Sequence, residues 1–217
     1  WVVVALFLLV SGVVFSLQVY LPAQPATLRA FFSSAVWMFS FIIPAVTMRS
    51  LASEYRQGTI ESLLTSPVAD WEVIFGKFLA AFGVVAAMLA PTLLYAVLLG
   101  FSSDLELGPI VSGYLGLLLL GAMYTALGVL ASTTTQSLMA AYLGAFFFWL
   151  VVGFVTTQGA ATLGESWGAW LYAASPRRHM AGFAKGVIDF AAIVYFLSLT
   201  ALFLLLAVRL LESKRWR

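Results

Sequence analysis

Long apolar runs separated by short polar segments make up most of the chain. Six of these runs approach the roughly 20 residues that an α-helix needs to cross the hydrocarbon core of a bilayer. They lie at about residues 1–20, 31–48, 73–99, 109–132, 137–158 and 188–211. The pattern predicts one all-α domain over residues 1–217, a polytopic membrane protein with six transmembrane helices. Pro91 is expected to kink the third helix, because proline interrupts helical hydrogen bonding.

The first apolar run begins abruptly at Trp1, with neither a methionine nor a basic flank before it. We therefore expect the native chain to begin earlier. A cleaved signal peptide is the alternative reading of this run. Residues 21–26 lack a clean small-x-small cleavage site, and the run is long for a signal sequence, which favours an uncleaved span.

Composition agrees with a membrane protein. Hydrophobic residues make up 63% of the chain and charged residues 9%, against roughly 45–50% and about 25% in soluble domains. The absence of cysteine excludes disulfides, a thiolate metal site and a cysteine nucleophile. The single histidine, His179, cannot form a metal site alone, and the dispersed basic residues give no footprint for nucleic acid. We expect no metal, no cofactor and no nucleic-acid partner.

The longest polar interruption spans residues 48–71, between the second and third apolar runs. Residues 51–57 read as the polar tail of a helix, and Gly58 suits the left-handed position just after a helix end. Thr59 is a candidate N-cap of a second, short helix that has Glu61 in its first turn and ends before Pro67. Glu54 and Arg56 precede it on the polar tail.

This short helix, predicted over residues 59–64, carries an apolar patch. Ile60, Leu63 and Leu64 fall on one face at helical spacing, with Glu61 beside them. Such a patch is typical of an element that docks on a partner. The alternative is an interfacial helix that rests on lipid headgroups.

Basic residues distinguish the two sides of the predicted bundle. The side with both chain ends and the 48–71 loop receives seven of them: Arg49, Arg56, Lys77, Arg209, Lys214, Arg215 and Arg217. The opposite side receives four: Arg29, Arg177, Arg178 and Lys185. Short cytoplasmic loops retain Lys and Arg, so the termini and the 48–71 loop are predicted to be cytoplasmic. Lys77, near a helix end, is expected to extend toward the headgroups.

Residues 159–187 form the longest predicted non-cytoplasmic stretch, and it is too apolar for a flexible loop. Residues 168–174 are expected to form an extracellular or re-entrant helix. Pro176, after Ser175, is typical of the first turn of a further helix. Arg177, Arg178 and His179 would face headgroups or the exit of a pathway, and for His179 a polar contact inside this extracellular cap is favoured.

No ionisable residue lies deep inside any predicted span, whereas ion-coupled carriers usually need one. The chain also lacks the Gly-x-x-x-x-Gly-Lys signature of a nucleotide-binding loop. Energy for uphill transport would therefore come from a separate ATPase subunit. Small residues at four-residue spacing, Gly121 with Thr125 and Ala140 with Gly144, predict close helix packing.

Two sequence patterns carry a resemblance to a known family. The first is Glu54-x-x-x-Gly58-Thr59-x-Glu61-x-Leu63-Leu64-x-x-Pro67, followed by Trp71-x-x-x-x-Gly76-Lys77-Phe78. The second is Ser175-Pro176 with His179, then Gly186-Val-Ile-Asp189 and Tyr195-Phe-Leu-Ser198. The chain resembles the permeases of type 2 ABC transporters, most of all the gliding-motility and nitrous-oxide-accessory branch. Such permeases place a cytoplasmic helix before the first span, which this sequence does not show.

The resemblance implies a bacterial inner-membrane permease that pairs with a second, identical or related permease chain among the membrane lipids. Each permease would rest on a cytoplasmic ATP-binding-cassette subunit, which binds ATP and magnesium and carries out the hydrolysis. Residues 59–64 would be the coupling helix that the ATPase pushes, and export would be the direction of transport. The permease itself would then not be an enzyme.

Two other function classes stay open from the sequence. A channel or secondary carrier would need a polar pore lining, for which the spans offer only Thr, Ser and Gln. A membrane anchor that holds a cytoplasmic complex without transporting anything would have the same docking loop. Co-purification with an ATP-binding-cassette subunit would separate these classes from a transporter.

Overall fold

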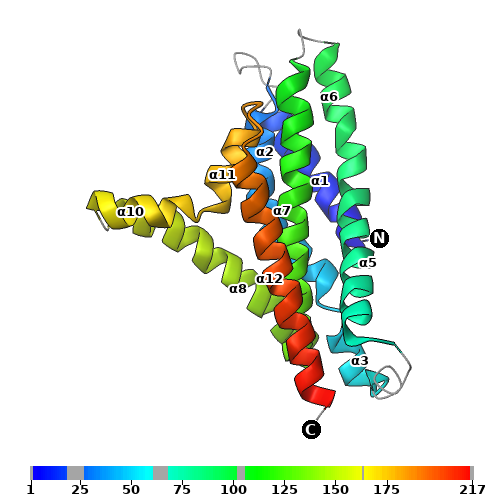
Figure 1. Ribbon diagram of the computed structural model, residues 1–217. Helices are drawn as coiled ribbons and strands as arrows, with labels where there is room; N and C mark the ends of the chain where they lie inside the picture. The colour runs from blue at the N-terminus through cyan, green and yellow to red at the C-terminus, as the bar shows by residue number, and fades with distance from the viewer. Residues whose placement is uncertain (1, 19–26, 61–67, 102–105, 163, 216–217) are drawn as a thin grey trace.

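The computed structural model describes residues 2–18, 27–60, 68–101, 106–162 and 164–215 (Figure 1). Within these ranges all regular structure is helical, and no strand occurs. The longer helices are α1 (Val2–Gln18), α2 (Arg29–Thr47), α5 (Asp70–Leu89), α6 (Leu93–Gly100), α7 (Leu107–Thr134), α8 (Leu138–Phe154), α10 (Gly164–Ala173), α11 (Pro176–Phe183) and α12 (Phe190–Arg215). The short ones are α3 (Ala52–Gln57), η1 (Ala90–Thr92), the π-helical turn η2 (Val155–Gly159) and α9 (Ala160–Thr162).

The predicted apolar runs coincide with helices. Five helical stretches among the described residues are long and apolar enough to cross a membrane: 29–57, 70–100, 107–134, 138–159 and 190–214. The first predicted span appears as a shorter apolar helix, α1, of 17 residues. The all-helical fold class is confirmed, and six crossings stay a prediction.

Helix α7 runs through the middle of the bundle and packs against α2, α5, α8, α11 and α12 (Figure 1). Its glycines permit this close approach, because a Cβ atom added at three of them would fall well inside contact distance of a neighbouring side chain. The nearest atoms would be Phe32 at 2.2 Å from Gly113, Phe183 at 2.8 Å from Gly116, and Thr47 at 2.0 Å from Gly128. The central position of α7 thus depends on residues that have no side chain.

The two predicted small-residue pairs have different outcomes. At Gly121, an added Cβ would lie 3.0 Å from Val85 of α5, so the close packing predicted there is confirmed. At Gly144 of α8, nothing lies within 4 Å. The prediction was therefore wrong for contacts within this chain, since α8 presents this side to no other described helix.

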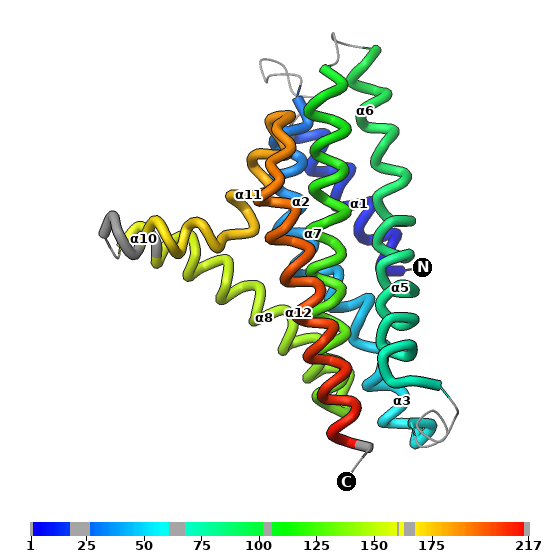
Figure 2. Tube along the Cα trace, viewed as in Figure 1, coloured from blue at the N-terminus to red at the C-terminus, as the bar shows by residue number. Residues whose placement is uncertain are grey.

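Helix α8 leaves the bundle at an angle, and α10 extends to the side before α11 returns to α2 and α7 (Figure 2). The outward face of α8 is apolar, as Phe147, Val151 and Phe154 illustrate. At Pro91, where a kink was predicted, the 3-10 turn η1 separates α5 from α6. The hydroxyl of Tyr114 donates a hydrogen bond of 2.6 Å to the carbonyl of Thr92 in this turn.

Candidate functional site

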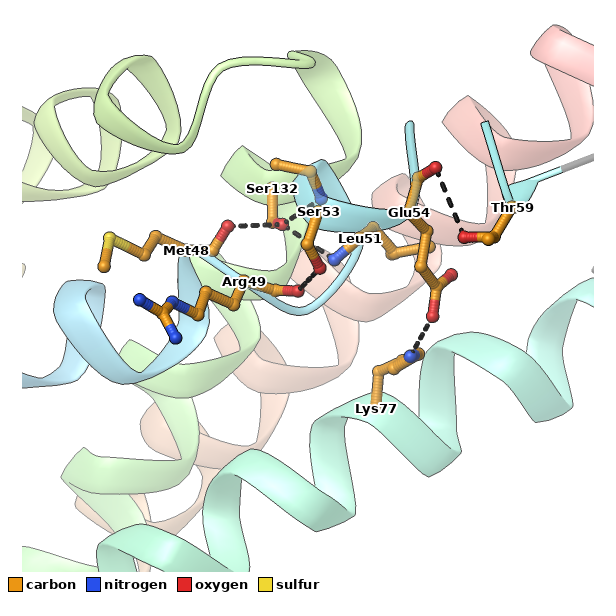
Figure 3. Close-up of polar contacts among 9 residues, drawn as sticks. Met48, Arg49, Leu51, Ser53, Glu54, Thr59, Lys77 and Ser132 are labelled. Carbon is orange, nitrogen blue, oxygen red and sulfur yellow. Dashed lines mark hydrogen bonds and ion pairs between the residues drawn. The ribbon is translucent and has the colours of Figure 1, made fainter. Parts of the chain in front are cut away.

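The turn between α2 and α3 is fixed to α7 by one buried hydroxyl (Figure 3). The Oγ of Ser132 accepts hydrogen bonds from the backbone N–H groups of Leu51 and Ala52, both at 2.9 Å. The same hydroxyl donates to the carbonyl of Met48 at 3.2 Å. These three bonds satisfy backbone groups that the turn leaves without helical partners. The start of α3 therefore follows any movement of the end of α7.

A second contact fixes α3 to α5. Glu54 forms an ion pair with Lys77, whose amine donates to the carboxylate Oε1 (Figure 3). The other carboxylate oxygen, Oε2, is buried and has no hydrogen-bond partner among the described residues. The expected extension of Lys77 toward lipid headgroups stays a prediction. The α5 helix places its amine beside a carboxylate of α3, which offers a stronger partner.

The end of α3 has the predicted form. Gly58 has a φ of +72°, the left-handed conformation that glycine adopts without strain. Thr59 Oγ1 donates a hydrogen bond of 3.5 Å back to the carbonyl of Glu54. The bond that would make Thr59 an N-cap involves residues outside the described ranges, so that assignment stays a prediction.

The predicted docking patch is only partly within the described residues. Ile60 is helical and 8% exposed, and it belongs to the buried core of this chain. The remaining predicted residues, Glu61, Leu63, Leu64 and Pro67, lie outside the described ranges. A role of residues 59–64 in coupling to a partner stays a prediction.

The C-terminal part of α12 reaches the same site. Lys214 Nζ donates a hydrogen bond of 2.6 Å to the carbonyl of Thr133, near the end of α7. The same amine lies 4.3 Å from the centre of the Tyr55 ring of α3. The end of α12 and α3 lie at one end of the bundle, as Figure 1 shows. Four helices, α3, α5, α7 and α12, thus meet in one polar cluster.

A groove of about 660 Å³ opens beside this cluster, between α3 and the turn that joins α7 to α8. It is lined by Met48, Tyr55, Arg56, Gln136, Ser137, Leu138 and Met139. Arg56 is exposed and forms no ion pair within the described part of the chain. The groove can therefore receive an acidic side chain at Arg56 and an apolar one against the methionines.

Sequence reasoning found part of this site. It identified Glu54, Arg56 and Gly58 from the polar loop, but it missed Ser132 and the lining contributed by residues 136–139. Ser132 lies in an apolar span, and its contact spans some 80 positions in the sequence. The one usable signal was the polar run at residues 132–137, which lies between the fourth and fifth apolar runs.

The second predicted site lies around α11. The predicted helix start is confirmed, with Ser175 as N-cap residue and Pro176 in the first turn, although Ser175 Oγ makes no capping bond. His179 Nε2 donates to the carbonyl of Ala173 at 2.9 Å, because a carbonyl can only accept. Partial burial lowers the pKa of His179 below its ordinary range. This is the polar contact favoured for His179, and its extracellular location stays a prediction.

The two arginines of α11 lie against aromatic rings. The guanidinium carbon of Arg177 is 5.2 Å from the centre of the Trp37 ring of α2. That of Arg178 is 5.6 Å from the Tyr172 ring of α10. Among the described residues, no group of three or more His, Cys, Asp or Glu side chains could hold a metal ion.

Comparison with known proteins gives a family for this architecture. A family model described as ABC-2 family transporter protein matches residues 14–209. The chain is also 26% identical, over 145 residues, to the "Probable multidrug ABC transporter permease YbhR" of Escherichia coli K12 and to its counterpart in Escherichia coli O157:H7. Each match covers 65% of this chain and 38% of the relative. These matches do not identify the gliding-motility and nitrous-oxide-accessory branch, so membership of that branch stays a prediction.

Proposed function

Because the chain belongs to the ABC-2 family of transporter proteins, we propose that it is the transmembrane permease subunit of an ATP-binding-cassette exporter. In this proposal it pairs with a second permease chain in the bacterial inner membrane. The two chains form the substrate pathway between them. Separate cytoplasmic ATPase subunits bind ATP and magnesium and drive the cycle.

The observation that supports this function most directly is the attachment of α3 to the spans. Ser132 ties the α2–α3 turn to α7, and the Glu54–Lys77 ion pair ties α3 to α5. Hydrogen bonds weaken steeply when distance or angle departs from the optimum, so a push on α3 is passed on rather than absorbed. Since α7 packs against five other helices, its displacement reaches most of the bundle. The proposed ATPase would act at this point.

The groove beside α3 is the proposed docking surface for the ATPase. Arg56 supplies an exposed cation, and Met139 supplies an exposed apolar side chain next to it. Residues 59–64, including Glu61, Leu63 and Leu64, are the proposed coupling helix. An ATPase surface that offers an acidic residue and an apolar one would match the groove.

Charge reversal in the groove tests this function. We expect Arg56→Glu to reduce co-purification of the ATPase by roughly tenfold or more, because truncating or reversing a charge at such an interface costs about 2–5 kcal/mol. Arg49→Glu is the matched control. Arg49 is also exposed and on the same side of the bundle, but it does not line the groove. Both variants remove the same positive charge, so any effect on membrane orientation is equal.

The outcomes distinguish the open alternatives. Equal co-purification of the two variants and the wild type would remove the groove as a docking surface and favour an interfacial helix. Loss of the ATPase in Arg56→Glu, without substrate-stimulated ATP hydrolysis in the wild type, would favour a non-transporting anchor. The exporter proposal requires both the selective loss and the stimulation.

Orientation of the proposed permease is testable with single cysteines, since the chain has none. The basic residues favour cytoplasmic placement of α3 and of both chain ends. A cysteine at the exposed Ser213 should be protected from an impermeant thiol reagent in intact cells. One at the exposed Leu107, the first residue of α7, should be labelled, because the chain crosses the predicted membrane along α7 between Leu107 and the α3 end. The reverse pattern would exclude a cytoplasmic docking site at α3.

A further inference from the structure

Two adjoining cavities lie well away from the α3 groove, the inner one between α2, α7, α8 and α11 and the outer one between α2, η2, α10 and α11. The inner cavity has a volume of about 10 Å³, which is the room of about one water molecule or one ligand oxygen. The outer cavity has a volume of about 280 Å³ and is lined in part by Thr157, Tyr172 and Met180. Val36 and Arg177 line both cavities, so the two adjoin at these residues.

The inner cavity is lined by buried polar side chains that can donate hydrogen bonds. Ser40, Tyr124 and Trp149 line it, and each is less than about 5% exposed. The hydroxyl of Ser40 donates a hydrogen bond of 3.1 Å to the carbonyl of Val36 in its own helix. Trp149 Nε1 has no hydrogen-bond partner among the described residues. An indole N–H can only donate, so Trp149, which lines this cavity, carries one buried donor that requires an acceptor.

Arg177 places a positive charge where the two cavities adjoin. Its guanidinium lies over Trp37, and it forms no ion pair with any carboxylate that the structure describes. The guanidinium is planar and presents donors in a fork that matches a phosphate or a carboxylate. An anion seated at Arg177 could direct one oxygen into the inner cavity toward Trp149.

The remaining walls are mainly apolar and aromatic, with the hydroxyls of Ser33 and Thr157 in the outer cavity. Tyr124 and Trp149 stack with their ring centres 4.0 Å apart, and Trp37 lies at the same cavity. A small ion would have to lose bound water to enter, and such walls offer too few polar groups to replace that water. They suit a molecule that has an apolar body attached to a small anionic group.

We propose that these cavities bind an anionic amphiphile through its phosphate or carboxylate group. The anionic group pairs with Arg177, and one of its oxygens accepts the Trp149 Nε1–H bond. The apolar part lies against Trp37 and the outer cavity walls. One part of this proposal rests on the proposed function, namely that such molecules are the class of substrate that is transported. Binding itself requires no ATPase.

The test measures binding to the purified permease without any ATPase, so its result is independent of the docking experiment. One arm titrates phosphatidylglycerol in phosphatidylcholine nanodiscs, and the other titrates decyl phosphate with phosphatidylcholine alone. Bound ligand per chain is counted by native mass spectrometry. Binding in the first arm identifies a membrane lipid as source, and binding in the second identifies a soluble amphiphile. Binding in neither arm overturns the proposal.

Matched variants locate the ligand. Arg177→Gln should weaken binding by roughly tenfold or more, as expected for a charged hydrogen bond, and Arg177→Lys should recover part of it. Trp149→Phe keeps the ring and removes the donor, so it should weaken binding by about two- to tenfold. Arg178→Gln removes the same charge one residue away and should bind like the wild type.

Two results would contradict the assignment. Equal weakening by Arg177→Gln and Arg178→Gln would indicate nonspecific attraction of anions to this end of the protein. Wild-type affinity in Trp149→Phe would show that the ligand does not reach the inner cavity. Trp149→Phe and Arg178→Gln keep the test decisive even if Arg177→Gln fails to fold.

Discussion

Helices α7 and α8 are alike in hydropathy and opposite in environment. The stretches to which they belong, residues 107–134 and 138–159, are both apolar enough to cross a membrane, yet 72% of the apolar segment in the first is buried and only 17% of that in the second. The difference lies in their small residues. The glycines of α7 meet side chains of α2 and α11, whereas Gly144 of α8 faces open space. Hydropathy therefore indicates which segments are spans, and close glycine contacts distinguish the central helix.

The two environments have different energetic origins. In lipid, an exposed phenylalanine or valine on α8 faces a solvent as apolar as itself, so the hydrophobic effect does not draw α8 toward the bundle. The position of α7 depends instead on van der Waals packing and hydrogen bonds. Because α7 is packed against its neighbours, it can transmit movement to them. Helix α8 is less tightly packed and contributes Trp149 to the inner cavity.

The largest expected difference in stability between the two helices comes from adding one methyl group to each. Gly128→Ala would place a Cβ atom 2.0 Å from Thr47 Oγ1 and 2.7 Å from Thr47 Cβ, so α2 and α7 must separate. We expect a loss of about 1–3 kcal/mol in the free energy of unfolding, or failure to accumulate. Gly144→Ala should be neutral or slightly stabilising, because alanine favours helix. Thermal unfolding in detergent measures both.

The control variant, Gly144→Ala, can contradict this difference in packing between α7 and α8. If Gly144→Ala destabilised the single chain as much as Gly128→Ala, α8 would pack within the chain as tightly as α7. If it left the monomer unchanged but weakened association of two chains, the open face of α8 would be the interface of the proposed permease pair. Size-exclusion chromatography of both variants separates these outcomes.

The next effect compares two buried hydroxyls. Ser132→Ala on α7 leaves the N–H groups of Leu51 and Ala52 without an acceptor, which we expect to cost roughly 1–3 kcal/mol. Thr156, close to α8, is also buried, but its hydroxyl donates to Val152 of its own helical segment. Thr156→Val should therefore change stability by less than about 0.5 kcal/mol. Equal losses would mean that the Ser132 bonds add nothing to the attachment of α3.

A smaller effect is expected from the ion pair between α3 and α5. Lys77 and Glu54 keep 33% and 20% of their side chains exposed, so solvent reduces their coupling to about 1 kcal/mol. Glu54→Lys and Lys77→Glu should each destabilise the fold, and the double variant should recover part of the loss. The exposed pair Arg209–Glu212 on α12 is the control, with a coupling near zero. A double-mutant cycle on thermal stability measures both pairs.

Much of this fold was predictable from the sequence, and the reasons are local. Apolar run length fixed the positions of the long helices, Gly58 marked the end of α3, and Ser175-Pro176 marked the start of α11. The attachment of α3 was not predictable, because Ser132 and Lys77 reach their partners across 81 and 23 positions in the sequence. The cavities at Arg177 were equally hidden, since Ser40, Tyr124 and Trp149 come from three separate spans.

The smallest expected effect concerns the contact between α10 and α11. Burial lowers the pKa of His179, with a further lowering by Arg178, while the bond to Ala173 and the charge of Asp189 act in the opposite direction. The unfolded chain therefore takes up a proton near pH 6.5, before the folded protein does. The stabilisation is complete above about pH 6.5 and is lost as the pH falls from there through the lower folded pKa. Thermal unfolding between about pH 7.5 and pH 5 should show a declining midpoint in the wild type. His179→Asn, which cannot titrate, should show a flatter profile. A midpoint that rose on acidification, or the same slope in both proteins, would contradict a buried neutral His179.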